Sequence, residues 1–369
     1  MKYQTDDLRI IGMHELTPPV ELHREYPLSE QATEVVFQAR QACHRILRGE
    51  DDRLLVVCGP CSIHDVDAAL EYASRLNHLR HELKDQLEII MRVYFEKPRT
   101  TIGWKGLIND PDLDNSFHIN KGLRLARKLL LDLNNIGVPA ATEFLDLISP
   151  QYVADLISWA AIGARTTESQ GHRELASGVS CPVGFKNGTF GNLNIAIDAI
   201  RAASHPHNFL SVTKAGHTAI FATRGNEDCH IILRGGQAPN YDAESVAMAM
   251  EALIDAHLPP YLMVDCSHAN SYKDYRRQPE VAADIARQIG QGNSAIVGIM
   301  IESHLQAGRQ DIADKKLEEL IYGQSITDGC IGFDTTEQVL YRLAEAVTQR
   351  RQHSDHISSA SASNFVVLP

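Results

Sequence analysis

The sequence has few of the features that mark secreted, membrane or nucleic-acid-binding proteins. Its 369 residues contain no apolar run long enough to span a membrane, and the N-terminus MKYQTDDLRIIGMHE carries acidic residues where a secretion signal has an apolar core. The net charge of −12 argues against a nucleic-acid or anionic-membrane partner that covers the whole surface. We therefore expect a cytoplasmic protein that binds neither membranes nor nucleic acids and confines any basic site to a small region.

Cysteine is also sparse, and its distribution does not indicate a disulfide framework. Seven cysteines are scattered through the chain, and their number is odd. Cys58 and Cys61 form a CxxC pair, which could belong to a redox centre or to half of a zinc site. No second CxxC follows, and the dipeptide GP (59–60) indicates a loop after a strand rather than the start of a helix. We therefore favour neither interpretation.

Short β-rich runs, most of them separated by segments of helical period, indicate the fold. Continuous apolar strands that alternate with helices predict a parallel sheet buried on both faces, which belongs to the α/β class. Eight such strands in a chain of this length favour a closed (β/α)8 barrel. A doubly wound open sheet is the alternative, although no glycine-rich dinucleotide motif follows the first strand. The predicted strands are residues 54–60, 87–95, 138–145, 159–165, 182–188, 229–236, 261–269 and 295–303.

Three segments do not belong to this repeat. Residues 1–50 precede the first predicted strand, and residues 205–224 alternate β-branched and polar residues around KAG (214–216), which predicts a β-hairpin. Both are predicted additions to a catalytic barrel that spans residues 51–348, and such additions often serve assembly or regulation. Residues 349–369 are polar and Ser-rich, which predicts a disordered tail.

Nearly every predicted strand ends in a side chain that can take part in chemistry. In a barrel these ends meet at one rim, where active sites of this architecture are built. An acidic protein has a reason to gather basic residues there if the site binds two phosphates and a carboxylate. Alternatively, each basic residue pairs only with a neighbouring carboxylate. The basic residues concerned are Arg92, Lys97, Arg99, Arg165, Lys186 and Arg234.

Four residues of metal-binding type form a possible metal site. Cys61, His268 and Glu302 lie at predicted strand ends, and Asp328 lies in the loop SITDGC (325–330). A mixed set of sulfur, nitrogen and oxygen donors suits Mn, Fe, Co or Zn, whereas Mg or Ca would not select a thiolate. The spacing alone leaves open that each of them is a satisfied core or helix-capping residue.

Lys186 raises a separate possibility. It closes an apolar strand in GFKNG, and aldolases on this fold use such a lysine to form a Schiff base. The alternative is a contact to a phosphate or a carboxylate. Residue types alone do not separate the two.

Ten motifs, in order along the chain, resemble those of the type I, α-subfamily 3-deoxy-D-arabino-heptulosonate-7-phosphate (DAHP) synthases. The similarity runs from about Asp6 to about Val347. The KPRTT element separates this family from the related octulosonate-phosphate synthases, which accept a five-carbon sugar phosphate. The motifs are GPCSIHD (59–65), RVYFEKPRTT (92–101), GWKGLINDP (103–111), EFLD (143–146), GARTTESQ (163–170), SCPVGFKNGT (180–189), ILRGG (232–236), SHAN (267–270), ESHL (302–305) and SITD (325–328).

The resemblance implies a transferase that condenses phosphoenolpyruvate with erythrose 4-phosphate and water, releasing phosphate, at the first step of the shikimate pathway. It implies a divalent metal cofactor, Mn, Fe, Co or Zn, held by Cys61, His268, Glu302 and Asp328. The implied catalytic residues are Lys97, Glu143, Lys186 and His268, so Lys186 becomes a phosphoenolpyruvate contact rather than a Schiff base. The implied substrate-binding residues are Arg92, Lys97, Pro98, Arg99, Thr100, Glu143, Ala164, Arg165, Lys186 and Arg234.

Two other functions stay open as alternatives. One is a metal-free or Schiff-base aldolase, and the other is a catalytically silent barrel that only binds an effector and a partner chain. A silent relative would have no reason to keep all the residues that match the metal and phosphate contacts.

Feedback control is a further implication of the resemblance. The family's regulatory site joins the N-terminal extension of one chain to the barrel and hairpin of another, which implies a homo-oligomer, dimer or tetramer. Ser211 stands where tyrosine-sensing relatives have Gly, so an effector pocket selective for phenylalanine is favoured and tyrosine is the alternative. The residues that match the phenylalanine-sensing version are Asp6, Asp7, Pro150, Gln151, Ser180, Phe209 and Ser211.

Some positions depart from that version of the regulatory site. Leu147, Val179 and Phe221 differ from its usual residues, and Phe190 replaces an acidic residue in a turn. The bulkier Phe221 in particular leaves the identity of the effector open. Alternatively, residues 1–50 only hold a dimer together.

Overall fold

The protein is described here from a computed structural model that covers residues 3–99, 103–312 and 319–363, with side chains described as far as residue 353. Its centre is a closed barrel of eight parallel strands, as the sequence predicts, so the open doubly wound alternative is wrong. Going round the barrel, the strands are β1 (Leu54–Gly59), β10 (Ile296–Glu302), β9 (Leu262–Asp265), β8 (Cys229–Leu233), β5 (Val183–Lys186), β4 (Trp159–Ile162), β3 (Ala140–Glu143) and β2 (Leu87–Arg92).

The barrel strands are buried on both faces, which explains their unbroken apolar sequences. Successive residues of β1 face opposite sides: Leu55 and Val57 belong to the cluster that fills the barrel, whereas Leu54 and Val56 pack against the surrounding helices. Trp159 is the largest side chain of the inner cluster and is fully buried. Because the interior is filled, the barrel is a rigid support for the residues at its ends.

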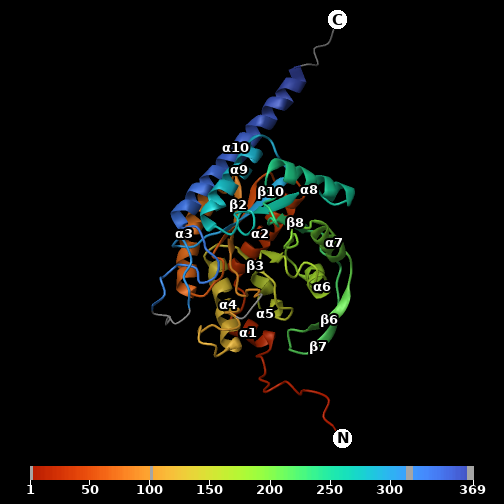
Figure 1. Ribbon diagram of the computed structural model, residues 1–369, viewed down its shortest axis with the longest axis vertical. Coiled ribbons are helices and arrows are strands. Elements are labelled where there is room, and N and C mark those ends of the chain that lie inside the picture. Colours follow the sequence, from red (N-terminus) through yellow and green to blue (C-terminus); the bar gives the residue numbers. More distant parts are fainter. Residues whose placement is uncertain (1–2, 100–102, 313–318, 364–369) are drawn as a thin grey trace.

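Helices surround the barrel and cover its outer face (Figure 1). Side chains at several N-termini satisfy free backbone N–H groups, as when Asp65 accepts from Ala68 N and Asp242 accepts from Ser245 N. No helix in the described ranges is long and apolar enough to cross a membrane. The helices between and after the strands are α3 (Val66–Glu82), α4 (Ile119–Asn135), α5 (Pro150–Val153), α6 (Gln170–Gly178), α7 (Asn194–Ala203), α8 (Ala243–Asp255), α9 (Gln278–Gly290) and α10 (Phe333–Ser363), with 3-10 turns η1 (Ala154–Leu156) and η2 (Tyr275–Arg277).

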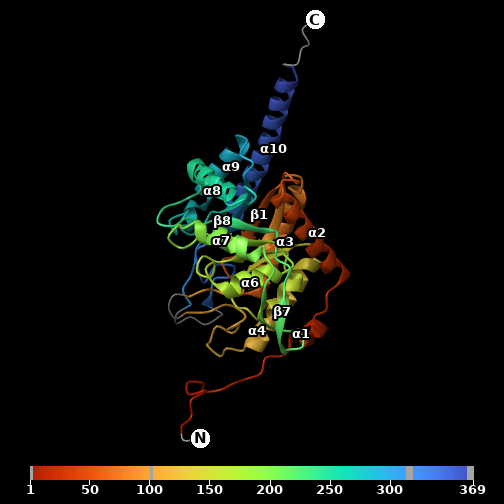
Figure 2. The same cartoon turned by 90° about the vertical axis from the view of Figure 1, so that its right-hand side faces the viewer.

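The N-terminal extension has two parts with different surroundings. Residues 3–18 form an arm without helix or strand that runs away from the barrel (Figure 2), and they are mostly exposed. The helices α1 (Pro19–Glu25) and α2 (Glu30–Leu47) follow. Ile46 and Leu47 of α2 join the inner cluster, so this helix covers the end of the barrel at which the strands begin.

The predicted hairpin is present as a separate two-stranded antiparallel sheet. It consists of β6 (Asn208–Val212) and β7 (Thr218–Ala222), and Gly216 in its turn has the left-handed φ of 84° that favours glycine. The hairpin leaves the barrel between β5 and β8 and lies beside α6 and α7 in Figure 1.

The C-terminal segment differs from the sequence prediction. Residues 349–369 were expected to form a disordered tail, but the final helix α10 continues to Ser363 and projects from the barrel, while residues 364–369 lie outside the described residues. Residues 333–363 contain no proline or glycine that would end a helix. The polar composition of residues 349–363 is therefore that of an exposed helix and does not indicate that the helix ends before them.

Candidate functional site

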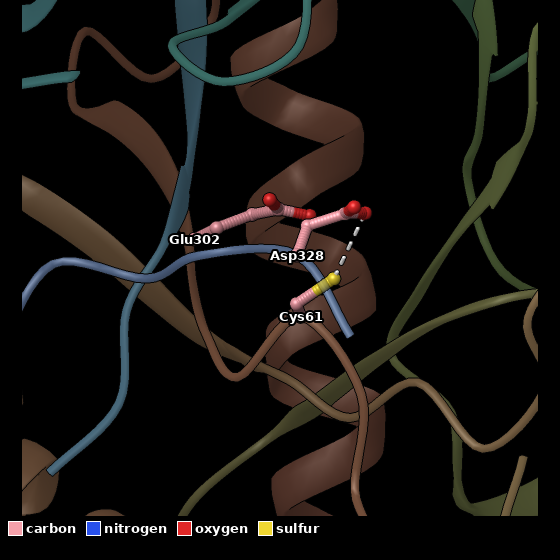
Figure 3. A group of neighbouring side chains, drawn as sticks. All are labelled: Cys61, Glu302 and Asp328. Atoms are coloured by element: carbon pink, nitrogen blue, oxygen red, sulfur yellow. Dashed lines mark hydrogen bonds between the residues drawn. The ribbon is translucent and has the colours of Figure 1, made fainter. Parts of the chain in front are cut away.

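Three potential metal ligands come together where the barrel strands end. Cys61 lies just after β1, Glu302 is the last residue of β10, and Asp328 lies in the loop before α10. One ligand atom from each, a sulfur and two carboxylate oxygens, lies within 4.8 Å of the others. The Cys61 thiol donates to Asp328 Oδ2 over 3.4 Å, and the Glu302 carboxylate points toward the same place (Figure 3). This donor set fits a divalent transition metal ion.

Glu302 is paired with Arg92 inside the protein. Both side chains are buried, and Arg92 Nη2 donates to Glu302 Oε1 over 2.9 Å. Arg92 Nε also donates to the Pro60 carbonyl over 3.1 Å, and the guanidinium stacks 3.5 Å from the centre of the Tyr94 ring. Burial alone would raise the pKa of Glu302, but Arg92 and His268 bring it below its ordinary value. The carboxylate is therefore ionised and fixed in position.

Lys97 brings a second positive charge to the cluster. Its Nζ lies 3.1 Å from Cys61 Sγ and 3.9 Å from Asp328 Oδ2. Burial, reinforced by Glu302, raises the pKa of the Cys61 thiol to about 11, although Lys97 opposes the shift. Burial would also raise the pKa of Asp328, but Lys97 and His268 bring it below its ordinary value. The thiol thus keeps its proton at neutral pH unless a stronger positive charge, such as a metal ion, lies beside it.

His268, the fourth predicted ligand, lies next to this cluster but is not one of the three residues whose ligand atoms meet. Its Nδ1 lies 2.9 Å from Asp265 Oδ2, at an angle unsuited to a hydrogen bond, so the contact is electrostatic. The same carboxylate oxygen accepts from Lys186 Nζ over 2.8 Å. Burial alone would raise the pKa of Asp265, but Lys186 and His268 hold it well below its usual range. The assignment of His268 as a ligand stays a prediction.

Glu143 and the loop after β4 lie against each other on the same rim. Glu143 ends β3, and a Cβ atom at Gly163 would clash with its Oε1, so glycine makes room for the carboxylate. Ala164 and Arg165 follow directly, and Arg165 Nη1 donates to the Pro98 carbonyl over 3.2 Å. The structure thus brings the segments predicted to bind the two substrates into direct contact.

The remaining predicted substrate cations have different surroundings. Arg234 follows β8, its backbone N–H donates to Asn187 Oδ1 over 2.8 Å, and burial lowers the pKa of its guanidinium although Asp265 opposes the shift. Arg99 is exposed, and its Nε donates to the Trp104 carbonyl over 2.8 Å. Thr100 lies outside the described residues.

The sequence left open that each basic residue at the strand ends only pairs with a neighbouring carboxylate. This explanation holds for some of these residues and not for others. Arg92 and Lys186 pair with buried carboxylates, and Lys97 lies near one. Within the described ranges, no carboxylate forms an ion pair with the guanidinium groups of Arg165 and Arg234. These two cations are free to contact an anionic ligand.

The CxxC cysteines do not act as a pair. Cys58 lies within β1 in the layer between strands and helices, near Tyr72, whereas Cys61 belongs to the cluster at the strand end. All seven cysteines are buried and free of disulfide bonds. The structure therefore gives no support to a redox centre formed by this motif.

A cavity of about 1050 Å³ lies between the hairpin, α2, α5 and α6. Val179 and Phe221, which differ from the usual residues of the phenylalanine-sensing site, line this cavity. The ring of Phe221 lies 6.1 Å from that of Phe209, centroid to centroid. Asp6 and Asp7 are exposed on the N-terminal arm and do not line the cavity within this chain. The predicted effector residues that line it are Pro150, Gln151, Ser180, Phe209 and Ser211.

Two residues that contact the site were not predicted from the sequence. Asp265 holds Lys186 and His268, and its Oδ1 accepts from Ser267 N over 2.9 Å. Ser267 Oγ donates in turn to Glu302 Oε2 over 2.8 Å. The available signal was the acidic residue that ends the apolar run YLMVD (261–265), since a carboxylate there must face a cation.

Comparison with known proteins gives a consistent assignment. The family model described as "DAHP synthetase I family" matches residues 25–341. A curated protein from Escherichia coli (strain K12), "Phospho-2-dehydro-3-deoxyheptonate aldolase, Phe-sensitive", is 64% identical over 351 residues, which are 95% of this chain and 100% of that protein. A "Phospho-2-dehydro-3-deoxyheptonate aldolase" from Haemophilus influenzae is 59% identical over 348 residues, covering 94% of this chain and 96% of the relative.

A solved structure is similar over almost the whole molecule. It is a phospho-2-dehydro-3-deoxyheptonate aldolase from Francisella tularensis SCHU S4, with 55% sequence identity and a TM-score of 0.91. The match covers 93% of this chain and 99% of that one. At this identity the likeness extends beyond the barrel fold, which many unrelated enzymes share.

Proposed function

Because the chain belongs to the DAHP synthetase I family, we propose that it condenses phosphoenolpyruvate with erythrose 4-phosphate and water to give DAHP and phosphate. Family membership already places it among the DAHP synthases, the enzymes of the first step of the shikimate pathway. The proposal adds the substrates and the dependence on a divalent metal ion, Mn, Fe, Co or Zn. The observation that carries it is the meeting of Cys61, Glu302 and Asp328 beside Lys97.

The proposed metal ligands are Cys61, Glu302 and Asp328, with His268 as the fourth. A metal ion bound there would supply Lewis acidity to the aldehyde of erythrose 4-phosphate. Magnesium is a poor fit, because a buried cysteine faces the site. Lys97 can shield the negative charge of the ligands, since its Nζ lies within 3.9 Å of both Cys61 Sγ and Asp328 Oδ2.

The other residues of the rim would bind and orient the two substrates. Arg165 and Arg234 are free to hold the phosphate of phosphoenolpyruvate, and Arg92 and Lys186 add positive charge deeper in the site. The segment from Lys97 to Thr100, which includes Pro98 and Arg99, would hold erythrose 4-phosphate.

Carbon 3 of phosphoenolpyruvate would then attack the aldehyde carbon, and positive charge would develop at carbon 2. Glu143 and Lys186 would orient the water that adds there. One proton of this water would replace the proton given to the alkoxide, and the other would leave on the phosphate, as hydrogen phosphate, when the bond between carbon 2 and oxygen breaks. Lys97 would give a proton to the new alkoxide, and His268 could do so only if it does not bind the metal ion. A Schiff base at Lys186 is disfavoured, since its Nζ is engaged in a buried ion pair with Asp265 and an ammonium ion is not a nucleophile.

The test is metal removal combined with a cysteine exchange. We expect a chelator to abolish phosphate release by the wild-type enzyme and Mn, Fe, Co or Zn to restore it, whereas borohydride should trap no substrate adduct. Cys61→Ala should stay folded and inactive with any of these metals. Cys58→Ala is the matched control, because it removes a buried cysteine three positions away that is not a ligand. Full activity of Cys61→Ala without bound metal would refute the proposal.

We also propose feedback inhibition by an aromatic amino acid, with phenylalanine favoured over tyrosine. The support is the cavity beside the hairpin, in which Pro150, Phe209 and Phe221 offer apolar walls and Ser211 takes up space. The E. coli relative at 64% identity is named as sensitive to phenylalanine. Titration of the activity with each aromatic amino acid tests the proposal, and the absence of inhibition by phenylalanine would end it.

We propose in addition that the protein is a cytoplasmic homo-oligomer, a dimer or a tetramer. Its support is apolar surface on the two additions to the barrel. The N-terminal arm exposes Leu8, Ile11 and Met13, and the hairpin exposes Leu210 and Ile220. Sedimentation equilibrium measures the assembly directly, and a monomer at micromolar concentration would contradict it.

A further inference from the structure

We propose that Asp265 is a positioning residue, which holds Lys186 for phosphoenolpyruvate and fixes His268 as a metal ligand through one shared carboxylate. The inference rests on the proposed function and deepens it. It concerns a residue that contacts Lys186 and His268, one proposed to bind substrate and the other to bind the metal ion. Three sets of contacts, on both carboxylate oxygens and on the backbone, lead to it.

The first set of contacts involves Oδ2 of Asp265. This oxygen lies 2.8 Å from Lys186 Nζ and 2.9 Å from His268 Nδ1. The two nitrogen-bearing side chains come from different segments, the end of β5 and the loop after β9, and Asp265 itself is fully buried. A single oxygen atom therefore sets the distance between a predicted substrate contact and a predicted metal ligand.

The second set of contacts involves Oδ1. It accepts from Ser267 N over 2.9 Å, and Ser267 Oγ donates to Glu302 Oε2 over 2.8 Å. The carboxylate thereby holds the turn that aligns Ser267 with a member of the metal cluster. His268 follows in this turn with a left-handed φ of 58°, a conformation that needs support from its surroundings.

The backbone of Asp265 is held as well. Asn270 Nδ2 donates to the Asp265 carbonyl over 2.8 Å and to the Leu233 carbonyl over 3.2 Å. This side chain joins the ends of β9 and β8, so the carboxylate is attached to a rigid part of the barrel. The Asp265 carboxylate therefore has a fixed position, and the side chains of Lys186 and His268 take their positions relative to it.

The chemical consequence differs for the two partners. With Asp265 Oδ2 2.9 Å from Nδ1, a small rotation of the His268 ring would let Nδ1–H donate to the carboxylate and leave Nε2 as the atom that can bind a metal. Outer carboxylates that hold a histidine in this way commonly change metal affinity by about 10–100-fold. For Lys186, the carboxylate limits the positions of the ammonium group, so that it can meet an anionic substrate without rearrangement. Loss of the negative charge should therefore weaken metal and phosphoenolpyruvate binding together.

The test compares Asp265→Asn with Asp228→Asn. Asp228 is the matched control because it lies 2.8 Å from the ring of His44, but at the opposite end of the barrel, just before β8. Metal affinity is measured on the stripped protein by competition with a chromogenic chelator, and phosphoenolpyruvate binding by the shift in Tm that it causes. We expect metal affinity to fall about 10–100-fold in Asp265→Asn and not in Asp228→Asn, with a weaker phosphoenolpyruvate shift only in the first.

A second variant keeps the test valid if Asp265→Asn does not fold. The pair Lys186→Met with Asp265→Asn removes both charges, so no unpaired lysine is left inside the protein. Its metal affinity is compared with that of Lys186→Met alone, which keeps the contact between Asp265 and His268. Equal affinities in these two proteins, or a folded Asp265→Asn with wild-type binding of metal and phosphoenolpyruvate, would overturn the inference.

The same data separate this inference from the proposed function. A wild-type enzyme that keeps its full activity after metal removal ends the proposed metal dependence. A wild-type enzyme that needs metal, beside an Asp265→Asn variant that binds metal normally, ends only the role of Asp265.

Discussion

The strand-end cluster and the cavity beside the hairpin differ in how much of each site one chain supplies. At the strand ends, two fully buried carboxylates have their partners inside the same chain, as Glu302 has Arg92 and Asp265 has Lys186. At the cavity the chain supplies walls, while the predicted acidic contacts, Asp6 and Asp7, stay exposed on the N-terminal arm.

This difference has a physical reason. A buried charge without a partner costs several kcal/mol, so it must be compensated as the chain folds. The cavity is open, so the charged residues that line it, Arg40, Asp155, Lys214 and Arg224, can keep contact with water, and its apolar walls cost little before a ligand or another chain covers them. A catalytic centre of charged groups is therefore built within one chain, whereas a regulatory pocket can be completed later.

The largest expected effect is at the cluster. Glu302→Gln keeps the shape of the side chain but removes a proposed ligand and the counter-charge of Arg92. We expect kcat/KM to fall by about 10³-fold or more and stability to fall by roughly 3 kcal/mol, measured by steady-state kinetics and urea unfolding.

A matched variant at the other end of the barrel sharpens this result. Glu88→Gln also removes the negative charge of a buried ion pair, because Glu88 Oε2 lies 2.7 Å from Arg53 Nη1 at the end of the barrel where the strands begin. It should lose stability but keep kcat. Retention of activity by Glu302→Gln would break the contrast between the two regions.

The next effect concerns the cavity. If the N-terminal arm completes the effector site, the double change Asp6→Asn and Asp7→Asn should raise the phenylalanine concentration for half-inhibition by about 10-fold or more, with kcat unchanged. Glu15→Gln, another exposed acid of the arm, is the control and should have no effect. Inhibition curves give the answer, and an unchanged curve for the double variant would mean that the arm has only an assembly role.

A smaller effect should separate the two candidate effectors. Ser211 lines the cavity, and Ser211→Gly opens space that a tyrosine hydroxyl can occupy. We expect the ratio of tyrosine to phenylalanine inhibition to rise about 10-fold. Thr218→Ser lies on the hairpin away from the cavity lining and should leave the ratio unchanged. If the ratio is the same in both variants, Ser211 does not select the effector.

The smallest effect lies at the junction of the two regions. Glu96 precedes Lys97, is buried, and accepts from Ser149 Oγ over 2.8 Å, next to Pro150 of the cavity. Burial raises the pKa of Glu96 to about 7, although Ser149 opposes the shift. The protonated form is thus favoured by folding, so its contribution to stability is complete below the ordinary pKa near 4.5 and is lost as pH rises through about 7.

Exchange of Glu96 for glutamine removes this dependence. We expect Glu96→Gln to match the wild type near pH 4.5 and to exceed its unfolding free energy by about 1–3 kcal/mol at pH 8, where the wild type must bury a charge. Urea unfolding at both pH values measures the difference. A difference that is equal at the two pH values would show that Glu96 does not titrate in this range.

The sequence predicted the barrel well because each of its eight apolar runs is long enough to be identified as a buried strand from local sequence alone. It also placed Cys61, His268, Glu302 and Asp328 in one possible metal site, since strand ends converge at one rim; ligand atoms of three of them lie together, whereas His268 as a ligand stays a prediction. It did not reveal the contacts of Asp265 and Ser267 with the site. The pattern of apolar and polar residues shows where a strand ends, but not which side chains there face a cation or a ligand. The helical course of residues 349–363 was missed because composition describes polarity and not hydrogen bonding.

Closure of the barrel also limits where new β-structure can form. All eight barrel strands have a neighbour on each side, so they offer no free edge to a further strand. Of the strands in the described ranges, only β6 and β7 keep an unpaired side, and there Leu210 and Ile220 are 84% and 74% exposed. If concentrated or partly unfolded protein aggregates through strand addition, it should begin at the hairpin, and a lysine at either position would make the protein more soluble.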